Sequence, residues 1–298
     1  MQQIPLTFPL PPDTSPALPA GLRLRRLTNG DLEAAEALTH NVQWPHRQED
    51  WRFSLALGDG VAVVRDAQAL GTALRWCWGE RHATLGLIIV SQPWQGQQIG
   101  RHLLDVLMHG MDGRSLLLHA TAEGRSLYER VGFKAAGEIF QHQGIAKPAQ
   151  VIELPKGVRL RPMGRSDAAA LVALDTLACG MPRDRLIRHL LAQGESVVLA
   201  RGSEAIGFSV LRRFGRGYQV GPVVAPDLSG AQALIGYWCS RHAGRFLRVD
   251  VEAAGSLPAW LTSMGLECAA SGTAMVRGLA PQRGFWHGGW ALVSQALG

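Results

Sequence analysis

Apolar residues in this chain form two alternating patterns, continuous short runs that predict buried strands and wider spacings that predict helices. The clearest example runs from Leu87 to Met108 and begins with a four-residue apolar run typical of a buried strand. Farther along, apolar residues recur at helical spacing at Ile99, Leu103, Leu104, Leu107 and Met108. A proline and two glycines separate the two parts, at Pro93, Gly96 and Gly100. The stretch therefore predicts a strand, a polar turn and an amphipathic helix.

A weak internal repeat organises the rest of the chain. Segments that begin at Gly21 and Gly157 each predict a strand, a turn with an aspartate cap at Asp31 or Asp167, and a helix. The first copy continues with strands near 61–66, 70–79 and 83–90, a helix 99–110, a strand 114–119, a helix 122–131 and a strand 133–140. The second continues with a helix 182–192, strands near 196–201, 205–213 and 217–224, a helix 229–243, a strand 245–251, a helix 256–264 and a strand 267–276. Strands that alternate with helices predict an α/β fold with a mixed sheet in each copy.

The length of 298 residues suits two such domains. Residues 1–20 carry six prolines and little periodicity, which predicts a flexible or extended tail. We therefore expect a tail over 1–20, a first domain over 21–145 and a second over 146–298.

Composition narrows the class of protein. Apolar residues make up 47% and charged residues 18%, as in ordinary globular proteins. No apolar run approaches the ~20 residues of a membrane span, and no secretory leader is visible. The four cysteines are scattered without a C-x-x-C pair, at Cys77, Cys179, Cys239 and Cys268. We expect reduced, mostly buried thiols in a cytoplasmic protein, with no membrane association and no metal site.

The net charge of +6 lies entirely in residues 151–298, because residues 1–150 carry equal numbers of acidic and basic groups. A basic half could attract an acidic substrate or a nucleic acid, but an arginine-rich solvated surface explains the excess as well. Basic residues do not run together with interleaved aromatics, so the pattern does not favour nucleic acid.

The turn after Val90 has its own chemistry. A strand that enters a helix through glycines leaves several backbone N–H groups pointing at one place, and the helix dipole favours negative charge there. The anion would be a phosphate or pyrophosphate. Neither the G-x-x-x-x-G-K-[ST] loop nor the G-x-G-x-x-G fingerprint occurs at this position.

Two motifs resemble those of the GCN5-related N-acetyltransferases (GNAT). The pattern Gln95-x-x-x-x-Gly100 after an apolar strand resembles the pyrophosphate loop of that family. About 30 residues later, the strand 116–119 and a helix that ends in Leu-Tyr-x-x-x-Gly-Phe at 127–133 resemble its second signature. The resemblance implies two tandem acyl-CoA N-acyltransferase folds, of which the second is degenerate.

The resemblance also implies an activity, the transfer of an acetyl group from acetyl-CoA to a primary amine of a small molecule or a protein. The pantetheine arm would lie along the strand residues Ile88, Ile89 and Val90. The pyrophosphate would bind the loop and the helix start, at Gln95, Gly96, Gln97, Gln98, Ile99, Gly100 and Arg101. Tyr128 occupies the position of the tyrosine that protonates the leaving thiolate, a role that contributes about 10²–10⁴-fold to rate.

The chain departs from the family pattern at two places. Gln98 replaces the first glycine of the Gly-x-Gly pair; the position needs either a positive φ or only a helical N–H, and we expect the second. The strand carboxylate that often serves as general base is missing, because Gly86 and Leu87 stand there. Glu80, His82, His119, a water relay and an amine that arrives neutral all remain open as alternatives.

Substrate contacts are expected from Trp44, His46 and Trp51, between the first two helices. The segment 285–290 reads as a tail that docks across a dimer or between domains. We expect the chain to be a monomer or a homodimer. The second copy has Pro226 and Asp227 where the phosphate loop would be, and Leu261 where the tyrosine would be. We expect it to serve a structural or substrate-shaping role.

A different class of function fits the same residues. Gln98 and the missing strand carboxylate suit a non-catalytic protein that binds or senses acyl-CoA. Tyr128 favours the enzyme, because a protein that only binds the thioester has no use for a thiolate acid.

Overall fold

The structure, a computed structural model, describes residues 18–66, 68–284 and 288–298. Most of the expected tail over 1–20, and the first part of the segment 285–290, lie outside the described residues. The chain divides into two compact units. Unit 1 consists of Met1–Cys77 and Ala83–Arg114, and unit 2 of Trp78–His82 and Ser115–Gly298.

Unit 1 is a twisted antiparallel sheet with helices. Its elements are β1 (Arg23–Arg26), the 3₁₀ turn η1 (Asn29–Asp31), α1 (Leu32–Asn41), α2 (Gln48–Leu57), β2 (Asp59–Arg65), β3 (Gln68–Trp78), β4 (His82–Val90), η2 (Gln92–Trp94) and α3 (Ile99–Met108). The strand order is β1-β2-β3-β4, with Val61 opposite Ala73 in the β2–β3 pair. The strands and the helix predicted for residues 61–110 are confirmed.

The buried side of unit 1 follows from the apolar spacing of α3. Ile99, Leu103, Leu104 and Leu107 are each 1% exposed or less. Burial of each such side chain stabilises the fold by about 1.5–3 kcal/mol. The helix start is therefore held in place by its own core residues.

Unit 2 contains the remaining elements. They are β5 (Ser115–Ala120), α4 (Ala122–Glu129), β6 (Lys134–Ile145), β7 (Val158–Pro162), η3 (Arg165–Asp167), α5 (Ala168–Cys179), α6 (Asp184–Gln193), β8 (Glu195–Arg201), β9 (Glu204–Phe214), β10 (Gly217–Ala225), α7 (Leu228–Arg241), β11 (Phe246–Glu252), α8 (Leu257–Ser263), β12 (Glu267–Arg277) and β13 (Gly288–Ala291). The order is β5-β12-β6-β11-β10-β9-β8-β7, with β13 added to β10. The elements predicted from residue 114 onwards are confirmed, and β13 was not predicted.

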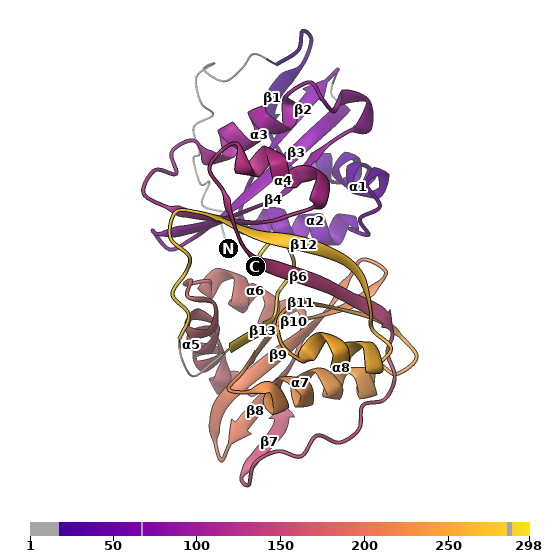
Figure 1. The fold of residues 1–298 in the computed structure, drawn as a ribbon, viewed down its shortest axis with the longest axis vertical. Coiled ribbons are helices and arrows are strands. Elements are labelled where there is room, and N and C mark those ends of the chain that lie inside the picture. Colours follow the sequence, from indigo (N-terminus) through magenta and orange to yellow (C-terminus); the bar gives the residue numbers. More distant parts are fainter. Residues whose placement is uncertain (1–17, 67, 285–287) are drawn as a thin grey trace. The chain divides into compact units, whose positions relative to one another are not determined.

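Two long strands, β6 and β12, each pair with strands of the other sequence copy (Figure 1). β6 ends the first copy, yet it lies between β12 and β11, with His142 opposite Val249. β12 ends the second copy and lies between β5 and β6, with Met275 opposite Leu118. β5, α4 and β6 therefore belong to the first copy by sequence and to unit 2 by packing.

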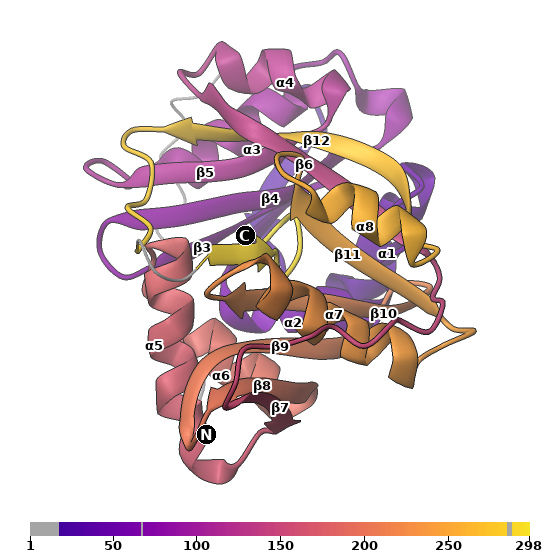
Figure 2. The ribbon, with the colours of Figure 1, turned by 60° about the horizontal axis from the view of Figure 1, so that its bottom comes forward.

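The core of unit 2 lies between the sheet and two helices. α7 and α8, orange in Figure 2, lie side by side, and their buried residues pack with Val197 and Leu199 of β8 and with Val249 of β11. Trp238 is 1% exposed and donates from its indole N–H to the Ser209 hydroxyl at 2.8 Å. α5 and α6 pack against β9 and contribute no residue to that cluster.

The repeat is visible in one recurring interaction. In unit 1 the Asp31 carboxylate accepts from the Thr28 N–H at 2.8 Å and from the Arg25 guanidinium. In unit 2 the Asp167 carboxylate accepts from the Gly164 N–H at 2.6 Å and from the guanidinium of the equivalent arginine, Arg161. The arginine hydrogen bond is the main reason that the pKa of each aspartate is lowered. Asp31 and Asp167 stand at the N-cap positions of α1 and α5 but make no side-chain hydrogen bond to those helices, so the expectation of aspartate caps is wrong. Each carboxylate binds the N–H three residues before it, at the 3₁₀ turn.

Two expectations from composition can be compared with the structure. None of the described helices has the length and apolar character of a membrane-spanning segment. The four cysteines are free, but Cys77 and Cys268 are exposed and only Cys239 is fully buried. The expectation of mostly buried thiols is therefore wrong for Cys77 and Cys268.

Candidate active site

The end of β4 is irregular at Leu87. This residue has φ of 51°, in the left-handed region, although it is a leucine and only 3% exposed. Its carbonyl accepts from the Thr72 hydroxyl of β3 at 3.1 Å, which holds the conformation. A bulky residue with positive φ is a true outlier, and such strain gathers at functional sites. Sequence reasoning missed this feature, because no residue type at 87 signals it.

The three strand residues expected to line the pantetheine arm follow this irregularity. Ile88 and Val90 are half-buried, and Ile89 is 3% exposed. The Val90 carbonyl accepts from the side-chain amide of Gln95 at 3.0 Å. Gln95 therefore ties the loop to the strand end, a role in the fold that its place in the motif did not reveal.

The loop itself turns on two residues with positive φ. Gly96 has φ of 78°, with open space where a Cβ would be, and Gln98 has φ of 61°. The expectation that Gln98 needs only a helical N–H is wrong, since its backbone is left-handed. A side chain in this region costs on the order of 1 kcal/mol relative to glycine. Gln97 donates from its side chain to the Pro93 carbonyl at 3.4 Å and closes the loop.

The start of α3 presents backbone donors. The first helical hydrogen bond in this turn runs from the His102 N–H to the Gln98 carbonyl at 3.0 Å. The N–H groups of Ile99, Gly100 and Arg101 precede that bond, and amides in the first helical turn have no partner within the helix. The side chain of Ile99 is buried, so this residue offers only its amide. Together with the helix dipole, donors in this position favour an anion.

Two arginines accompany the loop. Arg101 is paired with Asp105 one turn along α3, at 2.8 Å, so much of its charge is compensated. Arg65, at the end of β2, places its guanidinium 5.6 Å from the ring centroid of Trp94. Sequence reasoning missed Arg65, because it lies about 30 residues from the motif and reaches the loop only through the sheet.

Tyr128 lies in unit 2, in the last turn of α4. It is 9% exposed, and its ring meets Phe133 edge-on at 6.2 Å between centroids. Burial raises the pKa of the phenol to about 12, so the group remains a proton donor at neutral pH. The helix starts with Thr121, whose hydroxyl accepts from the Gly124 N–H at 3.3 Å. A Cβ at Gly124 would lie 3.1 Å from the Tyr128 ring, so the glycine leaves room for it.

The residues expected to contact the substrate differ in burial. Trp44 and His46 lie in the segment between α1 and α2, half-buried, with ring centroids 6.0 Å apart. Trp51 lies inside α2 and is 0% exposed, and its indole N–H points to the Thr39 hydroxyl at 3.4 Å. Trp51 is thus a core residue of unit 1 and not a wall for a substrate, because the helix begins earlier than expected, at Gln48.

The candidate general bases also differ in their exposure and surroundings. Glu80 is exposed in the turn between β3 and β4, and burial lowers the pKa of His82 at the first residue of β4. His119 is in β5 of unit 2, with Nδ1 2.6 Å from the Gln295 carbonyl, and burial lowers its pKa. His119 is therefore not a surface group, unlike Glu80.

The second copy has closed the equivalent strand edge. β10 pairs with β11 at Tyr218 and Gln219 and has an irregularity between Val220 and Val223. β13 then adds to β10 in antiparallel register along Val223–Ala225, and the Leu292 N–H bonds the Asp250 carbonyl of β11 at 2.9 Å. The segment at residues 288–292 thus bridges the two strands.

The start of α7 is closed as well. The Asp227 carboxylate accepts from the Gly230 N–H at 2.8 Å and takes the place at the helix start that an anion would occupy. Trp290 of β13 donates to the Ala225 carbonyl at 3.1 Å. The part of the segment 285–290 that the structure describes therefore docks within unit 2.

Comparisons with known proteins agree with this arrangement. Models of the acetyltransferase (GNAT) domain match residues 53–148 and, separately, residues 171–284. A Bacillus subtilis protein described as the uncharacterized N-acetyltransferase YitH is 27% identical over 174 residues, which span 57% of this chain and 61% of that protein.

Solved structures share the fold across both halves. A Pyrococcus horikoshii protein superposes with a TM-score of 0.76 at 16% identity, over 95% of this chain and 98% of that one. A tandem GNAT protein from the clavulanic acid biosynthesis pathway superposes with a TM-score of 0.63 at 14% identity, over 86% and 98%. With two matched domains and a tandem neighbour of the same fold, the chain belongs to the GCN5-related N-acetyltransferase family, as a tandem-domain member.

Proposed function

We propose that this protein is an N-acetyltransferase that transfers the acetyl group of acetyl-CoA to a primary amine. The observation that carries the proposal is the end of β4 in unit 1, where a strained Leu87 leads into a loop that ends at the free amides of α3. These donors, with open space beside Gly96, suit a diphosphate. Arg65 and Arg101 also accompany the loop, although Asp66 and Asp105 compensate part of their charge.

Different residues would act in different steps of the reaction. The edge of β4 at Ile88–Val90 would hold the pantetheine arm, so that the thioester carbonyl meets the amine in a fixed geometry. The nitrogen lone pair attacks that carbonyl, and the C–S bond breaks with its electron pair on sulfur. Tyr128 gives its phenolic proton to the departing sulfur, and the amine loses one proton to a base. The units holding the loop and Tyr128 are distinct, so their cooperation is part of the proposal.

We further propose that only the first sequence copy, 21–145, binds acetyl-CoA, and that the second, 146–298, does not. β13 and Asp227 support this, since each takes up hydrogen-bonding groups that a pantetheine arm or a diphosphate would need. The free cysteines are consistent with a reaction in the reducing cytoplasm.

The test combines calorimetry with thiol release. Titration with acetyl-CoA is expected to saturate at one molecule per chain. Free thiol is then followed with a chromogenic disulfide over a panel of small amines and peptides. Tyr128→Phe is expected to lower kcat by about 10²–10⁴-fold and to leave the affinity for acetyl-CoA unchanged. Tyr218→Phe, which makes the same change at a half-buried tyrosine of β10, is the control and is expected to keep full activity.

Three results would contradict the proposal. A rate for Tyr128→Phe equal to that of the wild type removes the tyrosine from the mechanism. Saturable binding without turnover on any amine indicates an acyl-CoA sensor. Two molecules bound per chain refute the closure of the second copy.

A further inference from the structure

Unit 2 contains a cavity of about 440 Å³ that none of the acyl-donor residues lines. Its walls come from β5, β6, β10, β11, β12 and α5, and from the segments at 181–183, 280–283 and 288–298. Most of the lining is apolar, including Leu117, Ile139, Met181, Val224, Met275 and Leu292. This volume and character are typical of a site for a small organic molecule, which is oriented by a few polar groups.

His119 is one of those polar groups, and its hydrogen bond defines its tautomer. Nδ1 lies 2.6 Å from the carbonyl oxygen of Gln295, which only accepts, so Nδ1 carries the hydrogen. Nε2 is then left with a lone pair, and the residue lines the cavity. Burial lowers the pKa of the ring, although Asp250 and Glu252 act against this and Arg283 acts with it. The imidazole is therefore a neutral acceptor at physiological pH.

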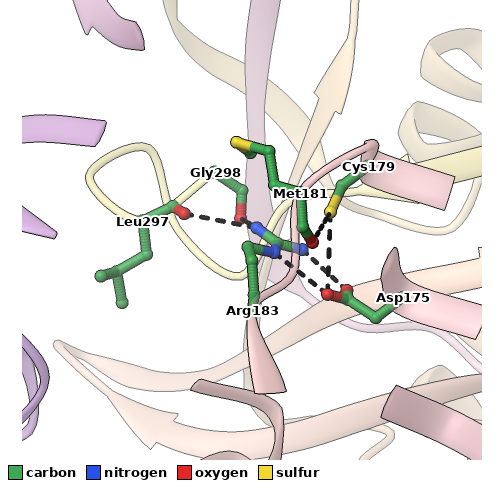
Figure 3. Close-up of polar contacts among 6 residues, drawn as sticks. All are labelled: Asp175, Cys179, Met181, Arg183, Leu297 and Gly298. Atoms are coloured by element: carbon green, nitrogen blue, oxygen red, sulfur yellow. Dashed lines mark hydrogen bonds and ion pairs between the residues drawn. The ribbon is translucent and has the colours of Figure 1, made fainter. Parts of the chain in front are cut away.

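The charged residues of the lining decide the sign of the ligand. Arg183 binds Asp175 through two hydrogen bonds of 3.0 and 2.7 Å, as Figure 3 shows. Arg283 pairs with Glu252. Both cations of the lining are thus committed to carboxylates. Glu138 of β6, an exposed residue, also lines the cavity, and none of the ion pairs found among the described residues includes it.

We propose that this cavity binds a small primary ammonium compound with an apolar body, held through Nε2 of His119 and the Glu138 carboxylate. An ammonium group has three N–H donors and no acceptor, which matches an acceptor lone pair and an unpaired carboxylate. The apolar body contacts the apolar part of the lining, which includes Met181 and Met275. An anion finds no uncommitted cation there. The inference rests on the proposed function in one respect, since it names the class of the acceptor amine.

The methionines that line the cavity provide the measurement. In the full chain labelled with ¹³C-methyl methionine, NMR follows the methyl signals of Met181 and Met275 during titration. The probe is 2-phenylethylammonium, compared with 2-phenylethanol and 3-phenylpropionate. The ammonium compound is expected to shift both signals saturably, the alcohol at least tenfold more weakly, and the carboxylate not at all.

Variants then assign the contacts. His119→Asn keeps a side-chain N–H for the Gln295 carbonyl and lacks the second ring nitrogen, and Glu138→Gln removes only the charge. Each is expected to weaken binding at least tenfold. The control is Glu267→Gln, the same change at an exposed strand residue outside the lining, which is expected to bind as the wild type does. Unshifted methionine signals with well-dispersed spectra show that a variant has folded.

The outcomes separate this inference from the proposed function. It is overturned if 10 mM 2-phenylethylammonium shifts neither methionine, if the carboxylate binds as well, or if both variants bind like the control. Binding that obeys the expected pattern in a chain that releases no thiol supports the cavity and contradicts the acetyltransferase. Thiol release on amines without any methionine shift supports the enzyme and overturns the cavity as the amine site.

Discussion

Replacing Arg183 by methionine removes the guanidinium that joins α5 to the end of the described chain. The arginine is 3% exposed, and besides Asp175 it binds the carbonyls of Leu297 at 3.3 Å and Gly298 at 2.5 Å. Burial by itself would lower the pKa of Arg183, but the Asp175 carboxylate raises it above the ordinary value, so the pair is charged. Methionine retains the apolar volume and leaves the carboxylate buried without its cation.

The expected loss follows from that uncompensated charge. Breaking a buried ion pair on one side costs about 3–5 kcal/mol, because the remaining charge keeps its desolvation penalty. At about 2–4 °C per kcal/mol for a unit of this size, the melting temperature should fall by about 6–20 °C. The matched control is Arg125→Met, which breaks the half-exposed pair with Glu129 and should cost less than about 1 kcal/mol.

Urea unfolding followed by circular dichroism and tryptophan fluorescence measures both variants. The double variant Arg183→Met/Asp175→Leu should recover at least half of the loss, because an apolar pair of similar volume replaces the ion pair without a stranded charge. The reasoning is refuted if Arg183→Met is as mild as Arg125→Met, or if the double variant is less stable than the single one.

Three further predictions follow from single features. Gln98→Gly should raise the free energy of unfolding by up to about 1 kcal/mol, because glycine adopts the left-handed backbone conformation without strain. The control Gln97→Gly should lower the free energy of unfolding. Equal effects of the two substitutions in urea unfolding would contradict this prediction. Gly221→Ala would place a Cβ 1.9 Å from the Leu292 oxygen and should speed amide exchange at Leu292 and Val293 at least tenfold by mass spectrometry, while Gly137→Ala, with open space at its Cβ, should not. The folded pKa of Tyr128 is raised to about 12, so its stabilising contribution is complete below the unfolded value near 10 and is lost as the pH rises towards 12. Wild-type stability should therefore fall by about 1.4 kcal/mol per pH unit relative to Tyr128→Phe between pH 10 and 12, and parallel urea midpoints for the two would exclude it.

Local pattern was enough to predict most elements of both units. The spacing of Ile99, Leu103 and Leu107 defines a helix whichever strand it packs on, because amphipathic periodicity depends only on neighbours in sequence. The glycines at 96 and 132 mark turns for the same reason, and both have positive φ. The motif around Gln95–Gly100 and the tyrosine at 128 could be found by pattern because each depends on a short stretch of chain.

Pairings between distant segments could not be found in this way. The apolar pattern of β6 suits β11 or β12 equally, and only the packed sheet places it between them. The addition of β13 to β10, and the contact of Arg65 with Trp94, likewise join residues about 30 or more positions apart.

Strain and burial were also decided in three dimensions. Leu87 adopts a positive φ because Thr72 and the surrounding core hold it there, and an isolated chain would avoid that conformation. Tryptophan and histidine occur both in cores and in functional sites, so the sequence could not decide between these roles for Trp51 and His119. The helices and strands that pack around each residue decided it. The periodicity of a sequence predicts which residues are buried. The residues that each one contacts depend on how strands and helices from distant parts of the chain pack together.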